Sequence, residues 1–409
     1  MKTSLSTATA PAKGTTTAKS PMKVCMHIVA EGYSTVRMMC TSTTLAEAGF
    51  TVSVVDLVVK RTAPLEENIG NVHMKHLIVP NWHTARRFGL WFFIIAVKTF
   101  ILSILRLIQA RADIYHATEL TALPACFIVS RLLRKPLIFE IYDLPFPTPY
   151  TGVAFWRWMG PYLYALLLPY CAEVIVTSPL HTQEIRKRYH VPTVTLVRHV
   201  PRYQVVKEGD RLRKHLGLSP DTRIAIYQGS LCPERGLDIL VHAAPFLERN
   251  IVIVIKGKGS DQALLEMLIT NAGVADRVKI IPPVPYEEML DWIGSADIGL
   301  IVHPPDFSLN TQTLLPQKLF EYLMAGLPVL SSELDAAVDV IKAYDVGQIL
   351  HSRAPSDVAR AINTMLANQT ALARMHQNAL HAVQENLCWE KEKEAFILLY
   401  QKVGALISA

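Results

Sequence analysis

Residues 315–329 read LPQKLFEYLMAGLPV, and this stretch predicts a short helix followed at once by a buried strand. Pro316 suits the first turn of a helix, because no backbone N–H is needed there. Gly326 suits the residue after the helix, and the apolar run from Pro328 onward predicts a strand. A helix that leads directly into a strand is the repeating unit of α/β domains, so the stretch predicts that fold class.

The start of this helix is a candidate anion site. Backbone amides and the positive end of the helix dipole favour a diphosphate, and Lys318 adds a full charge in the first turn. Glu321 lies three residues further on the same face, where its carboxylate can accept both hydroxyls of a ribose. A surface helix with an ordinary ion pair between Lys318 and Glu321 is the alternative.

Short apolar runs repeat on both sides of this stretch. In the second half they are IAIYQG (224–229), IVIVIKG (251–257), VKIIPPV (278–284), DIGLIV (297–302) and PVLSS (328–332). In the first half they are VCMHIV (24–29), TVSVVDL (51–57), DIYHAT (113–118), PLIFEIYD (136–143) and EVIVTS (173–178), with helical stretches such as 35–48 and 120–133 between them. Such runs are typical of buried parallel strands, so the sequence predicts two doubly wound domains.

The polar, charged segment 200–222 separates the two series of strands. We expect a disordered tail at 1–22, an N-terminal domain at 23–200 and a C-terminal domain at 201–388, with a last helix at 389–409 packing back on the first domain. The prediction is an α/β protein with two Rossmann-like domains that face each other across a cleft. Ligands of open α/β sheets bind beyond the carboxyl ends of the strands, so we expect the chemistry in that cleft.

A second phosphate signal follows the strand at 224–229. Gly229 in the motif YQGS permits close approach of the backbone to a ligand, and Arg235, before Gly236, can bind phosphate oxygens through its forked guanidinium. Alone this signal is weak, because an arginine at a helix start is usually just solvated.

In order and spacing, residues 224–347 resemble the donor domain of glycosyltransferase family 4, a retaining family with the GT-B fold. The resemblance rests on YQGS…RG and on LPQKLFEYLMAGLPV. It implies that Arg235 and Lys318 hold a diphosphate and that Glu321 binds the ribose, while Asn310 lies near the donor sugar. The donor-binding residues that it implies are Gly229, Ser230, Arg235, Asn310, Lys318, Leu319 and Glu321.

The resemblance also implies an activity. It implies transfer of a sugar from a nucleotide diphosphate sugar to a glycan or lipid-linked acceptor, with retention, by attack on the face from which the diphosphate leaves. The leaving diphosphate takes the acceptor proton while Arg235 and Lys318 stabilise its charge. No cofactor and no metal are then expected, and the lack of a DxD triplet agrees.

Two positions depart from the usual family pattern. Ser230 stands where an arginine is typical, and Thr313 stands where a first glutamate contacts the transferred sugar. A branch with the pattern GS…RG and PNKLFEYM lacks both, and the chain is identified as a member of that branch. Two alternatives stay open: a non-catalytic nucleotide-sugar-binding partner subunit, and another GT-B enzyme such as a nucleotide-sugar epimerase.

The N-terminal half resembles the acceptor domain more loosely, through segments 36–57, 112–125 and 135–144. Many relatives carry a histidine facing the reacting sugar at the position of Tyr142, which Asp143 follows, and these two residues complete the catalytic set that we expect. The acceptor-side cleft residues that we expect are Gly32, Tyr33, His116 and Glu119. Capping of strand ends, or a hydrogen-bonded core histidine, is the alternative.

Charge and hydropathy favour a membrane surface. The net charge is +6, and residues 1–205 hold an excess of Lys and Arg over Asp and Glu. The apolar stretch 88–108 contains Lys98 and Arg106, which argues against a spanning helix and leaves an interfacial helix or a core helix. No motif for nucleic-acid binding accompanies the basic charge, so we expect no nucleic-acid partner.

The six cysteines lie far apart and form no CxxC pair, as in a reduced cytosolic protein. The first 22 residues lack the apolar core of a secretory signal. We therefore expect a cytoplasmic protein that associates peripherally with the inner face of a membrane.

Overall fold

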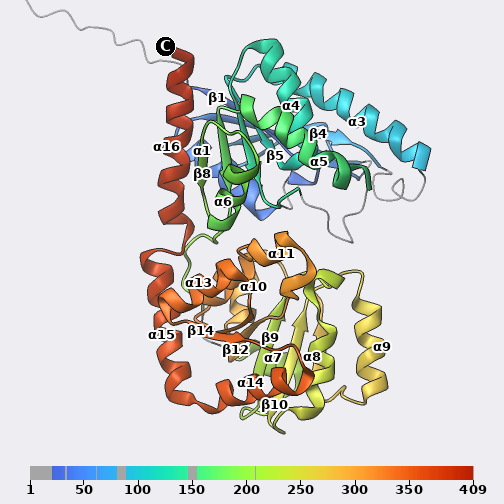
Figure 1. The fold of residues 1–409 in the computed structure, drawn as a ribbon, viewed down its shortest axis with the longest axis vertical. Coiled ribbons are helices and arrows are strands. Elements are labelled where there is room, and N and C mark those ends of the chain that lie inside the picture. Colours follow the sequence, from blue (N-terminus) through green and yellow to red (C-terminus); the bar gives the residue numbers. More distant parts are fainter. Residues whose placement is uncertain are drawn as a thin grey trace, which may run out of the picture.

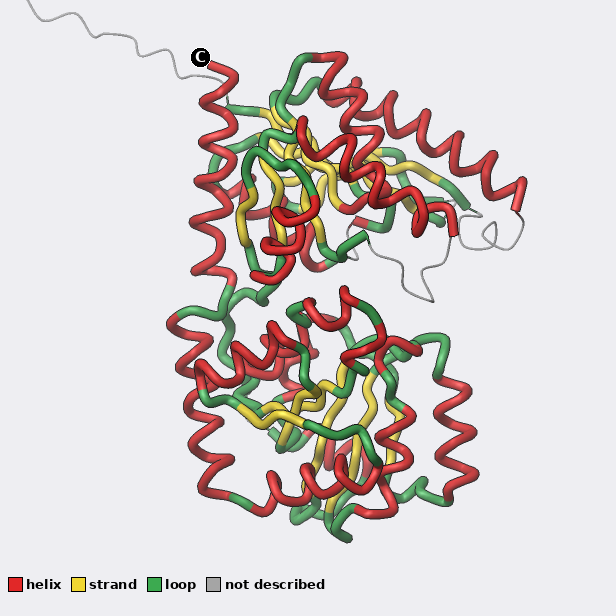
Figure 2. Tube along the Cα trace, viewed as in Figure 1, coloured by secondary structure: helices red, strands yellow, loops and turns green. Residues whose placement is uncertain are grey.

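The computed structural model describes residues 21–32, 35–60, 62–80, 89–145, 154–207 and 209–408. Two α/β domains lie one above the other along the long axis of the molecule (Figure 1). Helices flank the strands of both sheets (Figure 2). The expectation of two Rossmann-like α/β domains with parallel sheets is confirmed, while most of the predicted tail falls outside the described residues.

The N-terminal domain is built on an eight-stranded sheet with the order β3-β4-β2-β1-β5-β6-β7-β8. Only the β3–β4 pair is antiparallel among these described strands. The strands are β1 Lys23–His27, β2 Thr51–Val58, β3 Glu66–Ile69, β4 Val72–Ile78, β5 Ile114–Thr118, β6 Leu137–Ile141, β7 Glu173–Val176 and β8 Val194–Leu196.

Helices cover both faces of this sheet, because the chain first winds outward from β1 in one direction and later in the other. On one face lie α3 Gly89–Ala110, α4 Glu119–Leu133, α5 Ala154–Leu167 with the short η2 Leu168–Tyr170, and α6 Pro179–Arg188. The other face is covered by α1 Val36–Glu47 and by the last helix, α16 Trp389–Ser408. Alternate strand residues serve the two cores, as when Phe139 packs with the first set of helices and Ile138 with the second.

The C-terminal domain has a six-stranded parallel sheet with the order β11-β10-β9-β12-β13-β14. Its strands are β9 Arg223–Gln228, β10 Ile251–Lys256, β11 Val278–Ile281, β12 Ile298–Ile301, β13 Val329–Ser332 and β14 Gly347–Leu350. Its helices are α7 Arg211–Leu216, α8 Asp238–Ala243, α9 Gln262–Ala272, α10 Tyr286–Ile293, α11 Leu309–Thr313, α12 Gln317–Met324, α13 Asp335–Tyr344, α14 Pro355–Ala367 and α15 Gln369–Glu385, with short helices η3 Pro233–Arg235, η4 Ala244–Phe246 and η5 Pro305–Phe307.

The chain passes between the domains twice, and hydrogen bonds connect the two crossing segments. Glu392 accepts hydrogen bonds from the backbone amide of Arg198 at 2.8 Å and from its Nε at 2.7 Å. The amide of Trp389 donates to the carbonyl of Pro201 at 2.9 Å. Beyond the crossing, the indole of Trp389 donates to Thr44 of α1 at 2.8 Å, which holds the start of α16 against the N-terminal domain.

The sequence analysis did not predict four of the strands. The hairpin of β3 and β4 reads EENI and VHMKHLI, so charged residues and histidines interrupt its apolar pattern. The other two, β8 and β14, are only three and four residues long at the edges of their sheets. Short edge strands bury too little apolar surface to leave a clear periodic signal.

Candidate functional site

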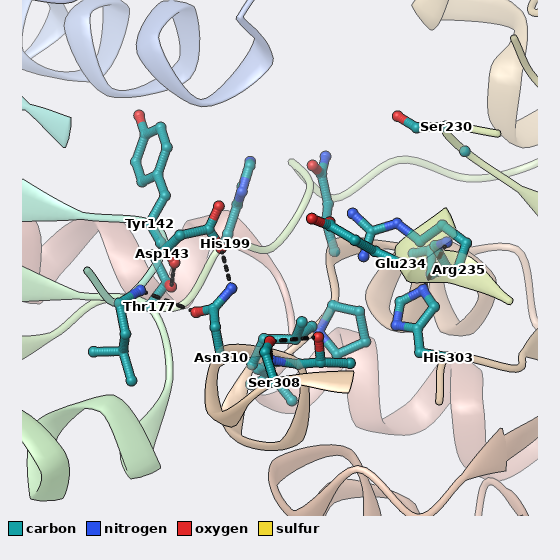
Figure 3. Close-up of a pocket in the computed structure, with 18 of the residues that line it drawn as sticks. Tyr142, Asp143, Thr177, His199, Ser230, Glu234, Arg235, His303, Ser308 and Asn310 are labelled. Carbon is teal, nitrogen blue, oxygen red and sulfur yellow. Dashed lines mark hydrogen bonds between the residues drawn. The ribbon is translucent and has the colours of Figure 1, made fainter. Parts of the chain in front are cut away.

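A cavity of about 470 Å³ lies between the two domains. Figure 3 shows side chains from both domains around it, at the carboxyl ends of the two sheets. The lining from the N-terminal domain is Tyr142, Asp143, Leu144, Thr177 and His199. The lining from the C-terminal domain is Gln228, Gly229, Ser230, Glu234, Arg235, His303, Ser308, Asn310, Thr311, Leu314, Leu315, Pro316, Gln317, Lys318 and Glu321.

Gly229 lines the cavity, and Gly257 of the neighbouring loop packs against it. Gly229, directly after β9, has φ +135°, a conformation that side-chain-bearing residues rarely adopt. A Cβ atom on Gly257, after β10, would lie 1.9 Å from the carbonyl oxygen of Gly229. The loop after β10 can therefore approach Gly229 this closely only with a glycine at position 257.

Lys318 lies in the first turn of α12 with only 9% of its surface exposed. Its Nζ sits 4.0 Å from the ring centroid of Tyr227 and 3.4 Å from Nε2 of His303. Burial, together with the charge of Arg235, lowers the pKa of Lys318 well below its ordinary value. This ammonium contacts an aromatic face and an imidazole, so an anion in the cavity would stabilise its charged form.

Glu321 follows one turn later and is 6% exposed. Burial raises its pKa to about 7, although nearby Lys318 and Lys256 oppose the shift. Lys256 ends β10 and donates to Oε1 of Gln228 at 3.0 Å, and burial lowers its pKa to about 8. The alternative of a surface helix with an ion pair between Lys318 and Glu321 is therefore wrong, because both groups are buried and line the cavity.

The pKa of Glu321 makes ligand binding depend on pH. A carboxylate accepts two ribose hydroxyls, whereas its protonated form accepts less well, so affinity for a nucleotide ligand should fall as pH drops through 7. Between pH 8 and pH 6 we expect the Kd to rise by about tenfold. Calorimetry of the wild type and of Glu321→Gln checks this, because the variant should lose the fall in affinity at low pH and keep the contribution of Lys318.

Arg235 enters the cavity from the end of η3. The turn continues through Gly236 at φ +57°, where a Cβ would meet the guanidinium of Arg353 at 2.5 Å. Ser230 also lines the cavity, and its carbonyl accepts a hydrogen bond from the hydroxyl of Tyr227 at 2.8 Å. The two motifs read from the sequence thus meet around one cavity.

Asn310 joins the two domains across the cavity. Its Nδ2 donates to Oδ1 of Asp143 at 2.9 Å, and its Oδ1 accepts from the amide of Leu144 at 2.9 Å (Figure 3). Ser178 forms a second bridge, donating to the carbonyl of Thr313 at 2.7 Å. The side chain of Asn310 is therefore engaged with the N-terminal domain, a role that the sequence did not predict.

Tyr142 and Asp143 both line the cavity, as expected for the acceptor side. Their neighbour His199 was missed, although a histidine in the loop that follows β8 could have signalled it. Its ring stacks on that of Tyr142 with centroids 6.2 Å apart, and burial lowers its pKa to about 3. Within the described part of the chain, Nε2 of His199 and the hydroxyl of Tyr142 are buried without a hydrogen-bond partner. Polar atoms in this condition are candidates for contact with a substrate.

Four expected site residues do not line the cavity. His116 is fully buried, bonded through Nδ1 to the hydroxyl of Tyr400 on α16, and its place on a central strand explains why it serves the core. The amide of Gly32 donates to Asp56 at 2.8 Å, and the side chain of Leu319 packs in the core.

Glu119 is the fourth, and it stands just behind the cavity wall. Its φ of +68° is strained for a residue with a side chain, and its carboxylate accepts from the amide of Tyr142 at 2.8 Å. Burial and the charge of Asp143 raise its pKa to about 8. Glu119 thus positions the loop that carries Tyr142 and Asp143. Tyr33, the remaining acceptor-side residue, lies outside the described residues.

Metal ligands do not gather in the described ranges: no group of three or more His, Cys, Asp or Glu side chains there could hold a metal ion.

Two family models match the chain, one for each domain. Residues 36–201 match the model described as Glycosyltransferase Family 4, and residues 209–382 match the model described as Glycosyl transferases group 1. Together they cover the described strands from β2 to β14 and leave out the first strand, the short segment 202–208 between the domains and the ends of the chain.

Individual relatives match only part of the chain and at low sequence identity. D-inositol 3-phosphate glycosyltransferase of Streptomyces bingchenggensis is 27% identical over 200 residues, which are 46% of this chain and 42% of that protein. The chain spans about half the length of the curated relatives that it matches.

Solved structures share the fold over nearly the whole chain. Sucrose-phosphate synthase from Thermosynechococcus elongatus superimposes with a TM-score of 0.79 at 16% identity, over 94% of this chain and 100% of that one. HepE of Anabaena in complex with UDP and glucose superimposes with a TM-score of 0.71 at 14% identity, over 93% and 100%. Each domain therefore matches a glycosyltransferase family model, and the chain as a whole has the two-domain GT-B fold.

Proposed function

We propose that this protein is a retaining glycosyltransferase that moves a sugar from a nucleotide diphosphate sugar to a glycan or lipid-linked acceptor. The observation that carries the proposal is the buried Lys318 at the start of α12, next to Arg235 and Glu321 in a cavity walled by both domains. Two cations and helix amides suit a diphosphate, and a buried carboxylate suits a ribose.

The diphosphate is the leaving group in this proposal. It lies at the start of α12, and negative charge grows on it as the bond to the sugar breaks. Lys318 and Arg235 stabilise that charge, while the departing oxygen takes the proton of the acceptor hydroxyl. Asp143 and Tyr142 stand on the opposite wall, where they contact the sugar or the acceptor.

A non-catalytic partner subunit is the second candidate, and one observation favours it. Thr313 stands where a glutamate would contact the transferred sugar, and its hydroxyl donates to the carbonyl of Leu309 at 2.7 Å instead of lining the cavity. Such a subunit would bind the donor without turning it over.

Donor binding is tested first. Thermal shift with uridine, guanosine and adenosine diphosphate sugars should show stabilisation by at least one class, and that stabilisation should persist in EDTA because cationic side chains hold the diphosphate. No shift with any class would contradict the proposal, and a shift that disappears in EDTA would contradict the metal-free site.

A further inference from the structure

Large apolar side chains gather on one side of the N-terminal domain. We call this set the outer face: on α3 Phe93, Ile94, Val97, Ile101 and Leu105; on α4 Ile128 and Leu132; on α5 Trp158, Tyr162 and Leu166; and on η2 Tyr170. Their exposed fractions run from 41% to 68%. Single exposed apolar residues are normal, but stripes spaced four residues apart on three helices are not.

The exposed stripes of the three helices point to the same side of the N-terminal domain. The three helices cover the same face of the sheet, and their inward residues, such as Leu107, Leu123 and Tyr164, share one core. The rings of Phe127 and Tyr170 lie 5.8 Å apart, and the guanidinium of Arg131 sits 5.3 Å from the ring of Tyr170, so α4 and η2 are directly linked. The opposite, solvent-facing sides therefore form one continuous surface.

The charged residues on the helices of the outer face are mostly basic, and the nearby carboxylate of Glu66 on β3 is paired with Arg106 of α3 at 3.1 Å. Lys98 on α3, Arg131 on α4 and Arg134 just after α4 are exposed, whereas α3 and α5 contain no Asp or Glu. The one carboxylate on these helices, Glu119, is at the cleft end of α4 and bonds to the backbone there. Basic residues among apolar and aromatic ones match an anionic bilayer, because apolar groups enter the headgroup region while cations stay at the phosphates.

We propose that the outer face docks on an anionic lipid bilayer, with α3, α4 and α5 lying against its surface. The outer face is separate from the cleft, so docking on a bilayer does not require a nucleotide sugar in the cavity. A protein partner would need a patch that places carboxylates and apolar side chains opposite the basic and apolar residues of the outer face. An anionic bilayer offers negative charge and apolar groups across its whole surface.

A spanning role for α3 does not fit its packing. Phe92–Ala110 is the one helical stretch within the described ranges that is long and apolar enough to cross a membrane. Yet Thr99, Ser103 and Leu107 are buried, and α3 packs on α4 in the domain core. If α3 left the domain to cross a membrane, that core would be exposed. The packing of α3 is therefore compatible with a membrane that contacts only its outer side.

The orientation of α3 connects the outer face with the cleft. Parallel strands end at the cleft, and a helix that precedes the next strand begins on that side. The first turns of α3, with Phe93 and Ile94, therefore lie nearest the cleft. If the proposed transferase activity holds, docking would bring a lipid-linked acceptor to the mouth of the active site.

Co-sedimentation of the full chain with vesicles tests the docking. The wild type should pellet with vesicles of phosphatidylglycerol and phosphatidylcholine, less so in high salt because surface charges are then screened. Ile101→Glu with Leu105→Glu should weaken the partition by at least about tenfold. The matched control is Leu264→Glu with Met267→Glu on α9, whose residues are similarly exposed at 46% and 51% but lie on the other domain, and it should pellet like the wild type.

Three outcomes would overturn the proposal. They are no pelleting of the wild type, equal pelleting of both double variants, or retention after alkaline carbonate washing, which would indicate a spanning helix. A wild-type dimer that Ile101→Glu with Leu105→Glu converts to a monomer would assign the outer face to a second copy instead. Donor-induced thermal shift, which should be unchanged in the folded variants, keeps failure of docking separate from failure of the proposed activity.

Discussion

Lys318→Ala should lower kcat by about 100- to 1,000-fold, the loss typical of one group that stabilises charge in a transition state. The reason is the position of its Nζ, buried at the start of α12 beside Tyr227 and His303. Charge on the leaving diphosphate is larger in the transition state than in the bound donor. The fall in kcat should therefore exceed the rise in KM for the donor.

Two controls make this result specific. Lys214→Ala removes an exposed lysine from α7 and should leave both constants unchanged. Lys318→Ala also leaves a gap against Tyr227, so its melting temperature must be measured to show that it is folded. A variant whose KM rises while kcat stays constant would place Lys318 in donor binding alone and contradict the leaving-group role.

Glu321→Ala should weaken donor affinity by about 1.5–3 kcal/mol, or roughly 10- to 150-fold in Kd, the size of a lost hydrogen bond to a charged group. Its carboxylate is 6% exposed on the cavity wall, and Lys256 and Lys318 lie close enough to influence its pKa. Removal of this carboxylate also takes away the negative charge that lies near the buried side chains of Lys256 and Lys318.

Calorimetry separates these two effects. If the ribose contact is lost, affinity for the intact donor falls strongly while affinity for inorganic pyrophosphate, which has no ribose, does not fall. Equal loss for both ligands would mean that Glu321 acts through the cations, and unchanged affinity for the donor would remove it from the site.

The sequence predicted the cavity residues of the C-terminal domain better than those of the N-terminal domain, for a physical reason. Lys318 and Glu321 lie one turn apart on one helix, so local periodicity alone puts them on the same face. Both residues line one cavity together with Gly229 and Arg235. The turns at the ends of β9 and η3 are likewise set by residues close in sequence.

The cavity wall of the N-terminal domain depends on contacts between distant segments. Asn310 meets Asp143 across 167 positions of sequence, and no local pattern indicates which partner it takes. His116 also has the pattern of a strand-end residue, but α16 returns from the far end of the chain and Tyr400 covers it. His199 went unnoticed because the strand that precedes it has only three residues.

Turnover by the purified full-length protein tests the central claim most directly. With the donor class that gives a thermal shift and a pool of lipid and glycan acceptors, nucleoside diphosphate release is followed over time in the presence of EDTA. We predict release that requires acceptor, a product whose anomeric configuration by NMR is that of the donor, and at least a hundredfold slower release in Lys318→Ala, as for loss of one charge-stabilising group. Tight donor binding without acceptor-dependent release would contradict the account and identify the protein as a binding subunit.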